Sequence, residues 1–250
     1  PFVSPEWTAK FKVAKEIMVR GLIATEDGRA EILAQKELPR NGAGGTLELD
    51  PDIHIPDYYE GVNYHISLEG MEDYDLFGKG AGGFATLNVV YKYGGFAAVP
   101  FNTNMHLQRL DAIAQFPKAE YGRIYEVGCG GVRTLLALSE RFPGGGVVPC
   151  DLSGSALKSA HDTAERIGLK VHLKQKDCRN TGDPDASFDG VFSYAVHHEA
   201  PVPANLEMFR EFFRILAPGG GLVISGPPPF RAVGPFQGAI RRQWSGRRGS

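Results

Sequence analysis

Three acidic residues and a run of glycines occupy positions where an α/β protein binds nucleotides. Glu126 ends a short apolar run and is followed by Gly128, Gly130 and Gly131. Glycines at such a turn let the backbone bend sharply and approach a ligand closely, because they carry no Cβ. The dinucleotide-binding fingerprint needs a further glycine where this chain has Arg133, so the turn does not favour an NAD site.

The carboxylate of Glu126 indicates a cationic ligand. A pyrophosphate binds bare backbone N–H groups and positive charge, whereas S-adenosylmethionine carries a sulfonium, an ammonium and no phosphate. Asp151 stands at the end of the second predicted strand, where it could accept hydrogen bonds from both ribose hydroxyls. Asp177 follows the third predicted strand and could accept one from the adenine amino group. The three carboxylates together predict an S-adenosylmethionine site.

These residues depend on strands that end at one edge of a sheet. The predicted strands cover residues 123–127, 146–150, 170–174, 188–193 and 221–225. The predicted helices cover residues 103–116, 132–142, 153–167 and 206–216. This alternation predicts an α/β, Rossmann-like fold with a doubly wound, mostly parallel sheet in three αβα layers. Ligands of such sheets bind beyond the carboxyl ends of the strands, where the three carboxylates lie.

Several stretches resemble the class I S-adenosylmethionine-dependent methyltransferases, specifically the small-molecule type with a methyltransferase domain 11 pattern. The stretches that carry the resemblance, in the family's order and spacing, are residues 126–130, 150–153, 176–178, 187–198 and 209–220. The resemblance covers about residues 103–226. It implies methyl transfer from S-adenosylmethionine to a small-molecule acceptor, with an O, N, S or C nucleophile left open.

The resemblance also implies the residues of the site. Cofactor contacts are expected from Glu126, Gly128, Cys129, Gly130, Gly131, Asp151, Leu152, Asp177, Cys178 and Tyr194. The candidates for catalysis, after the fourth strand, are His197, His198 and Glu199. One histidine would act as general base for the acceptor, and a purely structural turn is the alternative.

The chain departs from the family in two places. Val132 stands where the family usually has another glycine, so either the turn is rearranged or the cofactor binds more weakly. Only about 24 residues follow Gly226, where the family adds a helix and two strands. Either the chain is truncated there, or its N-terminal part supplies the missing sheet edge. An uncovered edge would favour pairing with another chain, which leaves a homodimer open.

Three segments are expected. Residues 1–102 form an N-terminal α+β extension, serving as a lid or acceptor pocket; residues 103–226 form the cofactor-binding core; and residues 227–250 form a Pro/Gly/Arg-rich tail. Cys129, Cys150 and Cys178 match no metal-binding spacing, so we expect no metal site and reduced thiols that serve as small packing groups.

Composition narrows the class of protein. The chain has 250 residues, 42% hydrophobic and 22% charged, with a formal net charge of −2. These values predict an ordinary soluble protein of the cytoplasm, and they give no reason to expect nucleic acid as a partner. No apolar run is long enough for a membrane span. Two other functions stay open: a non-catalytic binding module with this fold and, with less support, an NAD(P)-dependent oxidoreductase.

Overall fold

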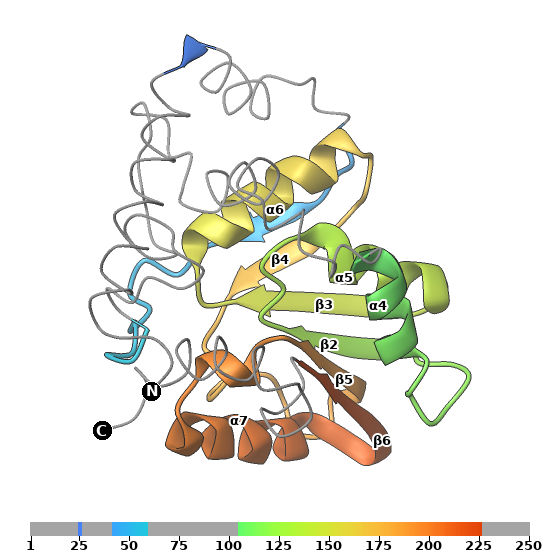
Figure 1. Cartoon of the computed structure of the whole chain (residues 1–250). Helices are drawn as coiled ribbons and strands as arrows, with labels where there is room; N and C mark the ends of the chain where they lie inside the picture. Colours follow the sequence, from blue (N-terminus) through green and yellow to red (C-terminus); the bar gives the residue numbers. More distant parts are fainter. Residues whose placement is uncertain (1–24, 27–41, 60–104, 227–250) are drawn as a thin grey trace, which may run out of the picture.

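The computed structural model describes residues 25–26, 42–59 and 105–226 (Figure 1). The strands are β1 Thr46–Glu48, β2 Arg123–Val127, β3 Gly146–Asp151, β4 His172–Gln175, β5 Phe188–Tyr194 and β6 Leu216–Ser225. The helices in the core are α4 Met105–Ile113, α5 Val132–Arg141, α6 Gly154–Arg166 and α7 Val202–Ile215, with a short 3-10 turn, η3, at His197–Glu199. None of the helices in the described ranges has the length and apolar character that a membrane span requires.

The six strands form one parallel sheet in the order β1-β4-β3-β2-β5-β6 (Figure 1). Neighbouring residues of β2 point to opposite faces, because strand side chains alternate. Ile124 packs in a cluster with residues of α4 and α5, whereas Tyr125 packs in a cluster with residues of α7. Helices therefore cover both faces of the sheet, which confirms the predicted α/β, doubly wound fold.

The N-terminal part of the chain supplies one strand of this sheet. Thr46 of β1 pairs with His172 of β4, in parallel register. This agrees with the alternative in which residues before the core add a sheet edge. The strand lies beside β4, however, and among the described residues no strand pairs with the free side of β6. The rest of the predicted lid, residues 60–102 and most of residues 1–41, lies outside the described residues, as does the tail 227–250.

The sixth strand begins earlier than predicted. The sequence predicts a strand at residues 221–225, but β6 already pairs with Phe188 of β5 at Leu216, and the register shifts before Gly190. Gly221 lies against the aromatic cluster of the core, where an added Cβ would come within 2.3 Å of the Tyr121 hydroxyl. The Pro-Gly-Gly stretch therefore lies within β6, in the irregular part between the pairs Phe188–Leu216 and Gly190–Gly221.

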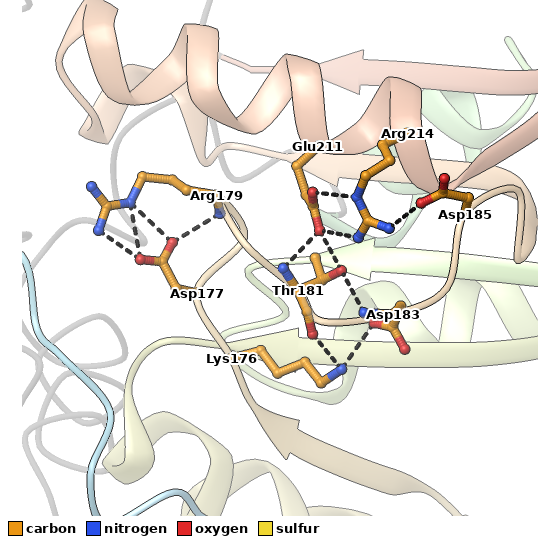
Figure 2. A network of polar contacts seen from close by, with 8 residues as sticks. All are labelled: Lys176, Asp177, Arg179, Thr181, Asp183, Asp185, Glu211 and Arg214. Carbon is orange, nitrogen blue, oxygen red and sulfur yellow. Dashed lines mark hydrogen bonds and ion pairs between the residues drawn. The ribbon is translucent and has the colours of Figure 1, made fainter.

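A polar network fastens the connection between β4 and β5 to α7 (Figure 2). The backbone N–H and hydroxyl of Thr181 both donate to Glu211 Oε1, at 2.8 and 2.6 Å. Arg214 donates to both oxygens of the same carboxylate, and to Asp185 Oδ1 at 2.6 Å. These hydrogen bonds, chiefly those from Arg214, lower the pKa of the buried Glu211 carboxyl to about 2. Glu211 therefore stabilises the fold in its charged form.

Replacing Glu211 with Gln is expected to lower the free energy of unfolding at pH 7 by about 2–3 kcal/mol, because charge-assisted bonds to a buried carboxylate are lost. The folded pKa lies below the unfolded value, so the stabilisation is complete above about pH 4.5 and is lost as the pH falls toward 2. Urea unfolding at pH 7 and at pH 3 measures both effects. Equal stability of the two proteins at pH 7 would contradict the assignment.

Candidate functional site

The turn after β2 has the backbone geometry that a close ligand approach requires. Gly128 has φ +59° and Gly130 has φ +54°, in the left-handed region that favours glycine. A Cβ on Gly128 would come within 2.6 Å of Val196 Cγ2. Gly131 is the N-cap of α5 in extended conformation, with no side-chain cap hydrogen bond. The first turn of α5 therefore lacks a side-chain acceptor at its positive end.

Val132, the residue that departs from the family's glycine pattern, does not enter the turn. Its side chain is buried and packs with Leu135 of α5 and Leu157 of α6. It is the first residue of α5, so its side chain belongs to the core between two helices.

Asp151, at the end of β3, ties the glycine turn to the sheet. Its Oδ2 accepts from the backbone N–H of Gly130 at 2.8 Å, and its Oδ1 accepts from that of Ser153 at 2.8 Å. Burial raises the pKa of Asp151 to about 6, against the opposing effect of those two hydrogen bonds, and the nearby Glu199 raises it further. Each carboxylate oxygen has acceptor capacity beyond one bond, so the group holds the turn and still offers acceptors to a ligand.

Glu126 is a buried acid whose carboxyl lacks a hydrogen-bond partner in the described part of the chain. Its side chain is 1% exposed, and neither carboxyl oxygen has a hydrogen-bond partner among the described residues. Burial raises the pKa of Glu126 well above its ordinary value, with Arg109 acting in the opposite direction. Because an unpaired buried carboxyl is costly, it points to a ligand that supplies the missing donor.

Arg109 is a site residue that the sequence analysis missed. It lies on α4, its Nε donates to Thr134 Oγ1 in the first turn of α5 at 2.9 Å, and its guanidinium carbon lies 4.4 Å from the centre of the Tyr194 ring. Burial lowers the pKa of Arg109. The only indication in the sequence was a cationic residue beside the apolar stripe of a helix, which rarely marks a site. Tyr194, a predicted contact, thus stacks on this guanidinium, and its hydroxyl donates to Gln108 Oε1 at 3.3 Å.

The segment after β4 lies next to Asp151. The backbone N–H of Lys176 donates to the carbonyl of Asp151 at 3.0 Å. Asp177 itself is paired with Arg179, whose Nη2 donates to Oδ2 at 2.6 Å. Leu152 is half-buried and accepts at its carbonyl from Gln175 Nε2, at 2.9 Å.

The three cysteines lie close to the site without forming a metal centre. The Sγ atoms of Cys150 and Cys178 are 3.7 Å apart and both side chains are buried. Cys129 packs at the edge of the cluster between α5 and α6, and burial raises the pKa of its thiol. No group of three or more potential metal ligands occurs within the described ranges.

The predicted catalytic residues form η3, directly after a turn in which Ala195 has φ 61°. The ring of His197 packs on Phe209 of α7, with centroids 4.9 Å apart, and its Nδ1 lies 2.5 Å from Asn205 Oδ1. Burial lowers the pKa of His197. His198 and Glu199 form a pair, with 3.6 Å between Nε2 and Oε1. Glu199 raises the pKa of Asp151, so its carboxylate acts electrostatically on that of Asp151.

The site therefore offers three buried or half-buried carboxylates, an arginine and a helix N-terminus at the carboxyl edge of β2, β3 and β4. This set suits a ligand with an ammonium, hydroxyl groups and an amino group, and one carboxylate near Arg109. It does not suit a pyrophosphate, which Glu126 and Asp151 would repel.

Residues 124–220 match a family model described as a methyltransferase domain. Demethylmenaquinone methyltransferase of Thermus thermophilus is 35% identical over 126 residues, which cover 49% of this chain and 54% of that protein. Trans-aconitate 2-methyltransferase of Azoarcus sp. is 33% identical over 117 residues, covering 47% of this chain and 44% of that protein. The chain thus spans about half the length of these relatives.

Among solved structures, phosphoethanolamine N-methyltransferase 2 of Haemonchus contortus, in complex with S-adenosylhomocysteine, aligns with a TM-score of 0.41 and 24% identity. That alignment covers 47% of this chain and 27% of the other.

Proposed function

We propose that residues 124–220, which match the methyltransferase family model, form a class I S-adenosylmethionine-dependent methyltransferase domain with S-adenosylmethionine as its cofactor, and that the protein methylates a small-molecule acceptor. The names of these two relatives refer to a demethylated quinone and to a tricarboxylic acid, so similarity to them does not select one acceptor class. The attacking atom, O, N, S or C, stays open.

The observation that carries this proposal is the unpartnered carboxyl of Glu126. We assign it to the cofactor's ammonium, because an ammonium supplies the donors that both oxygens lack. Arg109 and the uncapped N-terminus of α5 are assigned to the cofactor's carboxylate. Asp151 is assigned to the ribose hydroxyls and Asp177 to the adenine amino group. Gly128 and Gly130 allow the close approach, and Cys129, Gly131, Leu152, Cys178 and Tyr194 line the same edge.

The bound cofactor supplies an electrophilic methyl group on a positively charged sulfur. The protein's part is to align the acceptor and, for a hydroxyl or ammonium acceptor, to take up its proton. We propose that His198, with Glu199 beside it, does this, since Glu199 acts electrostatically on Asp151. His197 holds η3 against α7, through its contacts with Asn205 and Phe209.

We place the protein in the cytoplasm, in keeping with its free thiols Cys129, Cys150 and Cys178. A homodimer through the free side of β6 is consistent with the sheet order. The N-terminal extension 1–102 would form the acceptor pocket or its lid, and its described part already contributes β1 and Tyr58 to the core.

Calorimetric titration with S-adenosylhomocysteine and with NADH tests the cofactor assignment. We expect heat with the homologue and none with NADH; no heat with the homologue at high micromolar concentration would overturn the proposal. Turnover is then measured as release of S-adenosylhomocysteine from S-adenosylmethionine, with a panel of phenols, carboxylic acids, amines and thiols. Binding without turnover on every acceptor would favour the non-catalytic module.

A further inference from the structure

The carboxylate of Asp177 is held in one orientation by several donors of Arg179. The backbone N–H of Arg179 donates to Oδ1 at 2.8 Å. The side-chain Nε of the same residue donates to Oδ1 at 3.1 Å and to Oδ2 at 2.9 Å, and Nη2 donates to Oδ2 at 2.6 Å. Both side chains are half-buried, with 23% of Arg179 and 20% of Asp177 exposed. A guanidinium that binds both oxygens of a carboxylate in this way fixes the plane of the carboxylate, which a single point charge does not.

Arg179 is in turn held by two other elements (Figure 2 shows its contact with Asp177). Its Nη1 donates to Glu207 Oε2 of α7 at 3.4 Å, and its guanidinium carbon lies 5.6 Å from the centre of the Tyr58 ring. Tyr58 packs against the cluster that contains Cys178. The nitrogens Nε, Nη1 and Nη2 of Arg179 therefore each have a carboxylate partner, and the side chain has little freedom to move away from Asp177.

We propose that Arg179 is a positioning residue that holds Asp177 as a hydrogen-bond acceptor for the amino group of the cofactor's adenine, and that this pair makes the site select adenine over hypoxanthine. The inference rests on the proposed function. Three N–H groups of Arg179 hold the Asp177 carboxylate, which leaves one of its roughly four lone-pair positions to accept from the base. A six-amino group donates to such an oxygen, whereas the six-carbonyl of hypoxanthine is repelled by it.

The test compares two ligands, S-adenosylhomocysteine and S-inosylhomocysteine, whose bases differ in the six-substituent and in the proton that hypoxanthine carries on N1. For the wild-type protein we expect S-adenosylhomocysteine to bind at least ~30-fold more tightly. Replacing Arg179 with Gln frees the carboxylate to turn toward solvent, so the ratio of the two dissociation constants should fall about 10-fold. Replacing Arg179 with Lys should lower the ratio nearly as much, because an ammonium does not fix the carboxylate plane.

Arg214→Gln is the matched control. Arg214 pairs with Asp185 and Glu211 on the same connection between β4 and β5, so its loss weakens the loop without touching Asp177. The ratio of the two dissociation constants for Arg214→Gln should equal that of the wild type. Circular dichroism tests whether each variant is folded.

The outcomes separate the two claims. A wild-type protein that binds neither ligand overturns the proposed function and this inference with it. A wild-type protein that selects S-adenosylhomocysteine, together with an Arg179→Gln variant of unchanged ratio, overturns the inference alone. A wild-type ratio of dissociation constants in Arg179→Lys also overturns the inference, since charge alone would then explain the effect. A fall in Arg214→Gln as large as that in Arg179→Gln overturns it as well, since loop stability would then be the cause.

Discussion

Replacing Glu126 with Met is expected to make the protein more stable and a much poorer binder of S-adenosylhomocysteine. The substitution removes a buried carboxyl that has no hydrogen-bond partner among the described residues, and Met keeps a similar length. We expect the free energy of unfolding to rise by about 1–3 kcal/mol without ligand. The dissociation constant for S-adenosylhomocysteine should rise by about 30-fold or more, because a charged hydrogen bond to the ammonium is lost.

Urea unfolding and calorimetry measure the two effects on the same sample. Glu211 supplies the contrast, because it is also a buried glutamate but its oxygens accept from Thr181 and Arg214. Removal of its charge lowers stability, whereas removal of the Glu126 carboxyl raises it. A Glu126→Met protein that is less stable than the wild type, or that binds the ligand equally well, would contradict the assignment to the cofactor's ammonium.

Replacing Asp151 with Ala is expected to weaken binding of S-adenosylhomocysteine by ~100-fold or more. Two hydrogen bonds from ribose hydroxyls to a charged acceptor are lost, and the backbone N–H groups of Gly130 and Ser153 lose their acceptor. Calorimetry measures the affinity. Asp189→Ala is the matched control, because Asp189 also accepts from two backbone N–H groups, those of Gly122 and Arg123, at the opposite end of the sheet.

The pH dependence of binding separates the ribose contact from the support of the turn. The pKa of Asp151 in the free protein is raised to about 6, and the ribose hydroxyls prefer the charged form. Affinity should therefore be complete above about pH 6 and fall as the pH drops below it. Asp151→Asn lacks the group that titrates at about pH 6 and should lose this part of the pH dependence. A wild-type affinity that is constant from pH 5 to pH 8, or an Asp151→Ala protein that binds normally, would refute the ribose assignment.

The sheet and the carboxylates at its edge could be predicted because their causes are local. Apolar runs that end in Glu126 and Asp151 mark strand ends, and parallel strands bring their carboxyl ends to the same edge. The glycine turn likewise has a local cause, since Gly128 and Gly130 adopt a left-handed backbone.

Other features depend on contacts that no window of sequence contains. β1 has only three residues, and what makes it a strand is pairing with β4, 126 residues away. Arg109 is one of several polar residues on α4, and only the position of Tyr194 identifies it as a site residue. His197 follows a turn at Ala195, a non-glycine residue with φ 61°. Alanine rarely adopts this backbone conformation, so the residue type did not predict the turn.

The pairing of β1 with β4 has a consequence for biosynthesis. Thr46 leaves the ribosome long before His172, its partner, and translation at 5–20 residues per second makes the delay about 6–25 s. During that time the first strand has no sheet to join, and the sheet that forms later would present β4 as an open edge until the two meet. Expression of the core alone, from residue 105, would make that open edge permanent and would favour aggregation of the nascent or purified domain. The pairing of β1 with β4 thus covers a sheet edge that forms only after β1 has been synthesised.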